Sequence, residues 1–260
     1  MDRILIVEKD KTLANAMAKK ISDALEYEVD VAHTFNETKL FLRQYRYFLS
    51  ILDLNLPDAP NGEVVDYVLG KNQKVIVLSE NIDKGLKEKT LKKNIIDYVT
   101  KDGCDYTKYL IESIARLGKN KNHTILIVDD SMVMRKQLQA LLANIRFKTI
   151  AVAHGEEALA ILKTRDDVSL VLTDYNMPVM DGLELTQKIR ERYDKKILPI
   201  IALSSDDDQS TIALFLKKGA NDYIKKPFSK EEFSCRVHNG VETLEYIRLI
   251  TEYEVRFDDL

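Results

Sequence analysis

The sequence predicts an α/β protein made of two doubly wound domains, each with a five-stranded parallel sheet. The first observation is a repeat, because short apolar segments of the first half return in the same order in the second half. Residues 4–7, Ile-Leu-Ile-Val, return unchanged as 125–128, and Val-Ala-His at 31–33 returns at 152–154. The second observation is alternation: each apolar run is followed by a stretch with helical spacing, which is typical of parallel strands joined by crossover helices.

Length and composition agree with two ordinary globular domains. The chain has 260 residues, 45% of them hydrophobic and 31% charged, and domains usually contain about 100–200 residues. A net charge of −3 argues against a basic surface for direct binding of nucleic acid. No apolar run reaches the roughly 18 residues of a membrane span. Two cysteines in unrelated contexts fit a reducing compartment, so we expect a cytoplasmic protein with no membrane segment.

The remaining repeats complete the strands and set the domain bounds. Three further pairs of matching segments are 50–55 with 171–176, 75–79 with 200–204, and 97–101 with 222–226. The expected parts are a first domain over 1–118, a linker over 119–123, a second domain over 124–245 and a helical extension over 246–260. The linker is placed there because the stretch is polar and has no apolar period.

The helices of the second half follow from apolar side chains three or four residues apart. The first begins after Ser131, a candidate N-cap, and contains Leu138, Leu141 and Leu142. The other four are expected around 156–162, 183–189, 212–216 and 230–244. Right-handed crossovers then place the carboxyl ends of all strands at one edge of the sheet, where such folds carry out their chemistry.

Polar residues of the second half come directly after its strands. They are Asp129 and Asp130 after the first strand, Asp174 at the end of the third, Ser204 at the end of the fourth and Lys226 after the fifth. Carboxylates that converge at one edge repel one another, and a hard divalent ion such as Mg²⁺ relieves that repulsion. One carboxylate can then attack a phosphoryl group, whose oxygens are stabilised by the ion, the ammonium and the hydroxyl. The pattern therefore favours an aspartate that accepts a phosphoryl group.

With these residues both halves of the sequence resemble the receiver domain of two-component response regulators, a flavodoxin-like fold. In the second half the matching residues are Asp129-Asp130, Asp174 with Asn176 and Pro178, Asp181-Gly182, Ser204, Tyr223 and Lys226-Pro227. The resemblance implies that Asp174 is the phosphoacceptor. It implies that the Mg²⁺ ligands are Asp130, Asp174, the backbone carbonyl of Asn176 and, largely through water, Asp129.

The same resemblance assigns the switch residues and the partners. Ser204 would bind the phosphoryl group while the ring of Tyr223 turns inward, and Lys226 would pair with the phosphate. The phosphoryl donor would be a sensor histidine kinase or a phosphotransfer protein. Phosphorylation would then change dimerisation, partner binding or output activity.

The first half keeps only part of this pattern. Asp53, Ser79, Tyr98 and Lys101 match, whereas Glu8 and Lys9 stand in place of the acidic pair and Asp102 replaces the proline. A cation at position 9 repels Mg²⁺, and we expect Lys9 to pair with Asp53 instead. The loop from Asp53 to Gly62 is also one residue longer than the loop from Asp174 to Gly182. The first half is therefore interpreted as a degenerate receiver with a regulatory or structural role.

Apolar residues continue beyond the second domain. Tyr246, Ile250, Tyr253, Phe257 and Leu260 have the spacing of a helical seam. This seam predicts a helix that pairs in a homodimer; the alternative is a helix that packs back on its own domain. The ending Phe257-Asp258-Asp259-Leu260 resembles the entry to a diguanylate cyclase domain, an output domain missing from this sequence. We expect no separate catalytic domain in this chain.

Two other functions are weighed against phosphoryl signalling. A Mg²⁺-dependent phosphatase of the haloacid dehalogenase type also forms an aspartyl phosphate, but it needs a second aspartate where this chain has Asn176. A pure interaction scaffold would use neither site. The response of the protein to a small phosphoryl donor distinguishes the three.

Overall fold

The structure is a computed structural model that describes residues 2–80, 84–101, 105–205 and 209–258. The side chains at 209 and 255–258 are outside that description. Predictions that concern Asp102, Cys104, Leu260 and the side chain of Phe257 therefore fall outside the described residues. The chain divides into two compact units, Met1–Gly118 and Lys119–Leu260, and each is described by itself.

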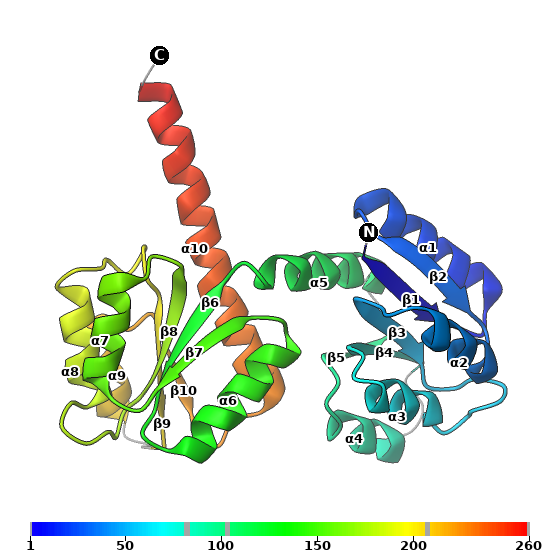
Figure 1. The fold of residues 1–260 in the computed structure, drawn as a ribbon, viewed down its shortest axis with the longest axis horizontal. Helices are drawn as coiled ribbons and strands as arrows, with labels where there is room; N and C mark the ends of the chain where they lie inside the picture. The colour runs from blue at the N-terminus through cyan, green and yellow to red at the C-terminus, as the bar shows by residue number, and fades with distance from the viewer. Residues whose placement is uncertain (1, 81–83, 102–104, 206–208, 259–260) are drawn as a thin grey trace. The chain divides into compact units, whose positions relative to one another are not determined.

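The first unit is a parallel sheet with helices on its faces (Figure 1). Its elements are β1 (Arg3–Val7), α1 (Lys11–Ala24), β2 (Glu28–Ala32), α2 (Phe35–Gln44), β3 (Leu49–Asp53), α3 (Glu63–Gly70), β4 (Val75–Ser79), α4 (Lys84–Leu91), β5 (Asp97–Thr100) and α5 (Tyr106–Asn120). The strands lie in the order β2-β1-β3-β4-β5, and all neighbours are parallel. Helix α5 begins in this unit, and its last two residues are counted with the second.

The second unit repeats this architecture. Its elements are β6 (Thr124–Val128), α6 (Met132–Asn144), β7 (Lys148–Val152), α7 (Gly155–Thr164), β8 (Val168–Asp174), α8 (Gly182–Arg190), β9 (Ile200–Ser204), α9 (Gln209–Lys218), β10 (Asp222–Lys225) and α10 (Lys230–Asp258). The strand order β7-β6-β8-β9-β10 corresponds strand for strand to that of the first unit. The predicted fold class, two doubly wound flavodoxin-like domains with five parallel strands each, is confirmed.

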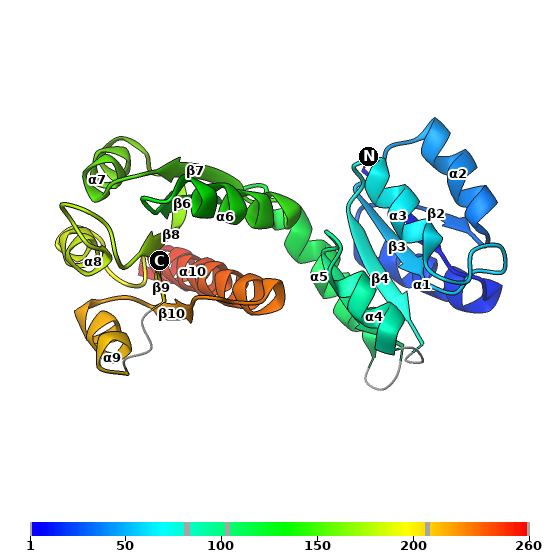
Figure 2. The ribbon, with the colours of Figure 1, turned by 90° about the horizontal axis from the view of Figure 1, so that it is seen from below.

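The burial of the central strands explains why they appear in the sequence as continuous apolar runs. Every residue of β3, β4, β8 and β9 is buried, because helices cover both faces of the sheet. In the second unit α6 and α10 pack together, while α7, α8 and α9 form a row in which neighbours are in contact, an arrangement that can be followed in Figure 2. The side chains of Asp10, Ser131 and Asp181 accept backbone N–H groups as N-caps of the helices that follow the strands.

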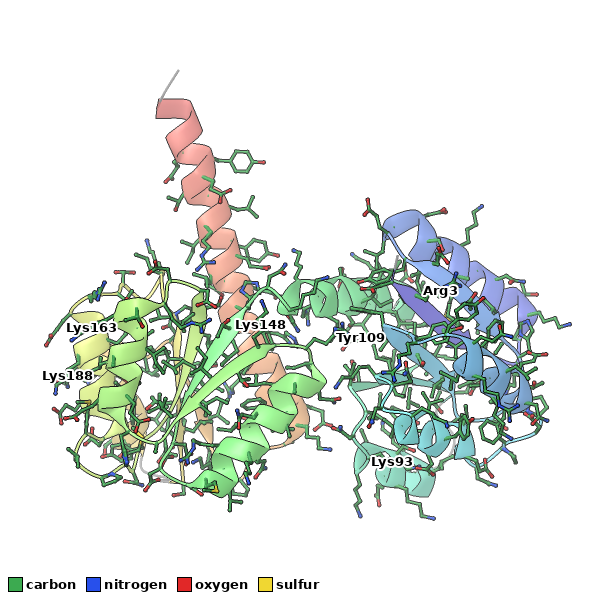
Figure 3. All side chains as sticks on the ribbon, viewed as in Figure 1. Arg3, Lys93, Tyr109, Lys148, Lys163 and Lys188 are labelled. Atoms are coloured by element: carbon green, nitrogen blue, oxygen red, sulfur yellow. The ribbon has the colours of Figure 1, made fainter. Side chains whose placement is uncertain are left out.

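Helix α10 has 29 residues and is longer than the others. It joins the last helix expected for the second domain, around 230–244, and the expected helical extension into one continuous helix. Among the side chains of α10 that the structure describes, the last buried one is Leu244, which is 1% exposed. Beyond that point Tyr246, Leu249, Ile250 and Tyr253 are all exposed. Ile247 and Thr251, which lie between them in sequence, line a cavity together with Ile197, and the side chains of the unit are drawn in Figure 3. Among the described residues no helix is both long and apolar enough to cross a bilayer.

Candidate functional site

The carboxyl ends of the strands in the second unit bring the predicted residues together. Asp129 follows β6, Asp174 ends β8, Ser204 ends β9 and Lys226 follows β10. The Lys226 Nζ atom lies 2.7 Å from Asp174 Oδ1 and 3.0 Å from Asp129 Oδ2. The backbone N–H of Lys226 also donates to the Ser204 carbonyl at 2.7 Å. Parallel strands therefore bring the carboxylates of Asp129 and Asp174 to the Lys226 ammonium, with the backbone of Ser204 next to them.

The carboxylates of this site have few donors of their own. Asp129 is fully buried and accepts the backbone N–H of Ser131 at 2.9 Å. Within the described part of the chain the exposed carboxylate of Asp130 makes no hydrogen bond or ion pair. Burial raises the pKa of Asp174, and the bond from Lys226 opposes that rise only in part. One ammonium thus faces three carboxylates, which leaves the site with excess negative charge.

This donor set fits a hard divalent cation. One oxygen from each of Asp129, Asp130 and Asp174 lies within 4.8 Å of the others. This separation is only slightly larger than the distance between two opposite ligands of one ion, each of which lies about 2.1 Å from it. Carboxylate oxygens are the ligands that Mg²⁺ prefers. Asn176, whose backbone carbonyl was the fourth predicted ligand, is exposed two residues after Asp174.

The backbone of Asp174 is held by a very close approach of helix α8. The Gly182 N–H donates to the Tyr175 carbonyl at 2.9 Å, and the Thr173 hydroxyl donates to the Asp174 carbonyl at 3.0 Å. A Cβ atom at position 182 would lie 2.1 Å from that same Asp174 carbonyl oxygen. Glycine is therefore required at position 182 by space rather than by its backbone angles.

The two predicted switch residues lie in the interior of the second unit. Ser204 is fully buried, and Tyr223 is 7% exposed with its ring centroid 6.4 Å from that of Phe215. Phe215 packs in turn against Tyr175, edge to face at 5.2 Å. The Tyr223 ring thus lies inside the second unit, beside Phe215.

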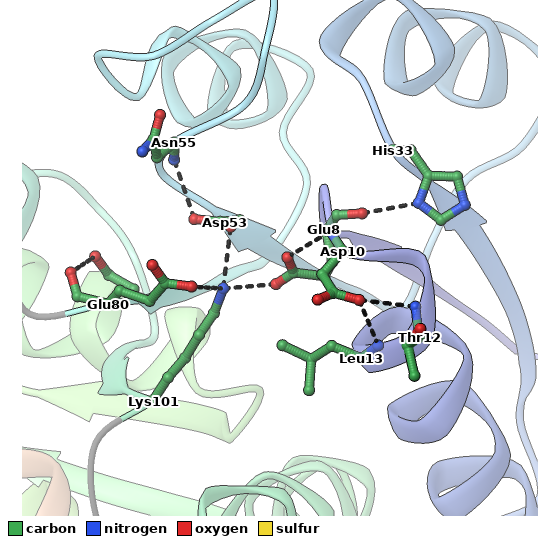
Figure 4. A network of polar contacts seen from close by, with 10 residues as sticks. Glu8, Asp10, Thr12, Leu13, His33, Asp53, Asn55, Glu80 and Lys101 are labelled. Carbon is green, nitrogen blue, oxygen red and sulfur yellow. Dashed lines mark hydrogen bonds and ion pairs between the residues drawn. The ribbon is translucent and has the colours of Figure 1, made fainter.

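The first unit builds a different site at the same edge (Figure 4). Lys101 Nζ lies 2.6 Å from Glu8 Oε2 and 3.0 Å from Asp53 Oδ2, and all three side chains are at most 6% exposed. The second oxygens of Glu8 and Asp53 accept the backbone N–H groups of Asp10 and Asn55, both at 3.0 Å. Glu8 therefore takes the place that Asp129 holds in the second unit.

Lys9 does not take the part that the sequence suggested. In the region described, Asp53 pairs with Lys101 rather than with Lys9, which lines a cavity of about 170 Å³ beside Asp53, Ser79 and Tyr98. Burial alone lowers the pKa of Lys101, but its bonds to Glu8 and Asp53 outweigh that effect and raise it. Lys101 thus supplies the positive charge that pairs with Asp53, a role that we expected of Lys9 from the sequence.

The longer loop between Asp53 and Gly62 of the first unit also has a structural role. Asp58 accepts the first two backbone N–H groups of α2, from Phe35 at 2.7 Å and from Asn36 at 3.0 Å. Leu56 and Ala59 form a short antiparallel bridge within the same loop. Burial raises the pKa of Asp58, but the backbone hydrogen bonds together outweigh that effect and lower it. The longer loop is therefore tied to the N-terminus of α2.

Comparison with known proteins agrees with this geometry. The model of the response regulator receiver domain matches twice, at residues 4–108 and 125–238. A chemotaxis protein CheY homologue of Campylobacter jejuni is 37% identical over 120 residues, which cover 46% of this chain and 92% of the relative. The rice two-component response regulator ORR11 is 37% identical over 110 residues, 42% of this chain and 75% of its own length.

A solved structure extends the similarity across both units. It is described as a two-component system response regulator/GGDEF domain protein, is 35% identical, and covers 94% of this chain and 100% of the solved chain with a TM-score of 0.81. The family match alone spans more than half of the chain. The chain belongs to the receiver-domain family of two-component response regulators and contains two receivers in tandem.

Proposed function

We propose that the second receiver accepts a phosphoryl group on Asp174. An oxygen of this carboxylate attacks the phosphorus of a phosphohistidine on a sensor histidine kinase or a phosphotransfer protein. The P–N bond breaks, its electron pair stays on the imidazole nitrogen, and that nitrogen takes up a proton. The observation that carries the proposal is the convergence of the carboxylates of Asp129, Asp130 and Asp174 at one strand edge, where Lys226 pairs with two of them.

The neighbouring side chains divide the work of stabilising the transferred group. Asp129, Asp130, Asp174 and the carbonyl of Asn176 would hold a Mg²⁺ ion, which would supply positive charge next to the phosphoryl oxygens. The Lys226 ammonium, already 2.7 Å from Asp174, pairs with another of these oxygens. The Ser204 hydroxyl binds the third, while the Tyr223 ring keeps its inward position beside Phe215.

The first receiver has a regulatory or structural role in this proposal and takes no phosphoryl group through Mg²⁺. The shared ammonium of Lys101 satisfies both of its buried carboxylates, and Lys9 stands where the second receiver has the ligand Asp130. An incoming cation would have to displace or repel two ammonium groups. We place both receivers in the cytoplasm, where the kinase domain that donates the phosphoryl group works.

The output is proposed to pass through α10 in a homodimer. Tyr246, Leu249, Ile250 and Tyr253 are 48–66% exposed and have helical spacing that puts them on one side. Burying such a stripe against the same helix of a second copy removes apolar surface from water. The GGDEF domain named for the similar solved structure favours a diguanylate cyclase as the output that this chain controls.

Phosphorylation with acetyl phosphate and Mg²⁺, followed by mass mapping of the modified peptide, tests the proposal. We expect one phosphoryl group per chain, on Asp174, and none in Asp174→Asn. Modification of Asp53 would reverse the assignment of the two receivers. If the unmutated protein is not modified at all, the result would favour the interaction scaffold over phosphoryl signalling. Continuous release of phosphate from the donor without a stable adduct would instead indicate a phosphatase.

The dimer is tested separately by sedimentation with and without beryllofluoride. We expect the phosphoryl mimic to shift the protein toward a dimer and Ile250→Glu to prevent the shift. Glu254→Lys, an exposed change on the same helix outside the stripe, is the matched control. A monomer under all conditions would contradict the proposed role of α10.

A further inference from the structure

A buried polar cluster lies at the edge of the second unit opposite the carboxylates. Asn120, His123, Ser169 and His238 are each at most 9% exposed, and Glu245 joins them from α10. His123 precedes β6 and Ser169 lies at the start of β8, so the cluster sits at the amino ends of the strands. The length of a five-residue strand, about 16 Å, separates it from the phosphoacceptor edge.

The cluster is joined by four short polar contacts. His123 Nδ1 lies 2.9 Å from the Ser169 hydroxyl, and His123 Nε2 lies 2.9 Å from Glu245 Oε1. The Asn120 amide donates to the Ile145 carbonyl at 2.7 Å, and the same nitrogen lies 3.0 Å from His238 Nε2. The Phe147 ring neighbours both imidazoles, with centroid distances of 6.5 Å to His123 and 5.6 Å to His238.

The donors and acceptors in this cluster are matched one to one. A carboxylate only accepts, so His123 Nε2 carries the hydrogen toward Glu245, and its Nδ1 can take the Ser169 hydroxyl. An amide nitrogen only donates, so His238 Nε2 is the acceptor of Asn120, whose two N–H groups are then both used. Buried polar groups that satisfy one another in this way make a specific connection, since losing one partner leaves the other unpaired.

The cluster joins the point where the chain enters the second receiver to the point where it leaves. Asn120 is the last residue of α5, while His238 and Glu245 lie on one side of α10, two turns apart. Leu244 is the last deeply buried residue among the described side chains of α10, and the bond between His123 and Glu245 lies next to it. Lys119 Nζ lies 3.7 Å from the second oxygen of Glu245.

We propose that this cluster is a second input to α10, separate from the phosphoacceptor. It anchors the helix to the entry segment at Lys119 and Asn120, so a change in that segment alters how firmly α10 is held even when Asp174 is unmodified. The inference rests on the proposed function in one respect, namely that α10 carries the output. No group of the cluster belongs to the phosphoacceptor site.

Hydrogen exchange of the full-length chain, measured by mass spectrometry, tests this connection from both ends. Asn120→Leu, a change outside α10, should raise exchange of α10 amides between His238 and Glu245 by about tenfold or more, because buried partners lose their donor. Glu245→Ala should raise exchange of the entry segment 119–124, because coupling between two sites is reciprocal. Glu252→Ala, which removes an exposed carboxylate from the same helix, should change neither.

The outcomes decide between the cluster as an input and the cluster as a local packing feature. Unchanged α10 exchange in a folded Asn120→Leu protein would overturn the proposal. If that variant does not fold, Glu245→Ala decides alone, and unchanged exchange at 119–124 overturns it. The rate of Asp174 phosphorylation by acetyl phosphate should be the same in all variants, and a parallel loss would show that the cluster acts through the phosphoacceptor instead. Absence of phosphorylation in the unmutated protein would refute the proposed function but not the exchange result.

Discussion

Lys101→Met removes the one ammonium that the two buried carboxylates of the first receiver share. Glu8 and Asp53 keep a backbone N–H each, from Asp10 and Asn55, but lose their only counterion in the described region. Breaking a buried ion pair by deleting one partner costs about 3–5 kcal/mol. The remaining backbone bonds place this case near the lower end, about 3 kcal/mol.

Lys226→Met is the matched change in the second receiver, and it should behave differently. Lys226 is 16% exposed and Asp174 12%, so water screens this site more and the loss should be about 2 kcal/mol. The carboxylates that are proposed to hold a cation, those of Asp129, Asp130 and Asp174, lie beside the deleted ammonium. Millimolar Mg²⁺ should therefore recover most of the stability of Lys226→Met and none of that of Lys101→Met.

Native-state hydrogen exchange in urea separates the two receivers in one experiment. Amides of β3 report the first unit and amides of β8 the second. With a urea dependence of about 1.5 kcal/mol/M, a loss of 3 kcal/mol lowers the midpoint of the first unit by about 2 M. The double variant Glu8→Gln with Lys101→Met should regain part of that loss, because one unpaired charge is gone.

Two results would refute the reasoning. Equal recovery of both lysine variants by Mg²⁺ would mean that the first receiver also holds a cation. A loss below about 1 kcal/mol in Lys101→Met would mean that its carboxylates are not stabilised by the ammonium but take up protons at little cost.

Three further predictions concern single positions. Lys9→Asp restores an acidic pair, so the Mg²⁺ stoichiometry in isothermal titration should rise from one to two per chain; a value that stays at one would contradict the role assigned to this lysine. Gly182→Ala should destabilise the second unit by about 1–3 kcal/mol and slow phosphorylation of Asp174, whereas Gly70→Ala, with nothing within 4 Å of the added Cβ, should do neither. Asp58→Ala should raise exchange of the first amides of α2, with a loss of about 0.5–2 kcal/mol. Because the folded pKa of Asp58 is lowered, its contribution to stability should be present above the ordinary pKa of about 3.9 and disappear as the pH falls through the lower folded value. Protection of these amides that stays the same as the pH falls through this range would argue against the cap.

Much of the architecture could be predicted because it is written in local patterns. The strands are continuous apolar runs, such as Ile125–Val128, and the repeat fixes their order twice. Asp129, Asp174 and Lys226 could be brought together because parallel strands end at one edge of the sheet. The same logic located Asp53 and Lys101 in the first receiver.

What could not be predicted depends on side-chain reach and on contacts between distant segments. Glu8 is one methylene longer than the aspartate it replaces, and only the folded geometry shows that it still reaches Lys101. The alignment of Glu8 with Asp129 in the repeat was the available signal. His123 and His238 lack metal-ligand spacing, so the sequence offered no reason to connect them through Asn120 and Phe147. The helical end of α5 at Asn120 lies inside the stretch expected to be a linker.

Because α10 is long, a small change of angle at its anchored turn produces a large displacement at its far end. Beyond Glu245 the helix continues to Asp258, an arm of about 20 Å at 1.5 Å per residue. A tilt of about 10° at the last buried turn moves the end of such an arm by about 3 Å. Rearrangements too small to disturb the packed sheet can therefore become displacements comparable to the width of a side chain at Asp258. The precision with which one turn of helix is held sets how finely a distant partner can be positioned.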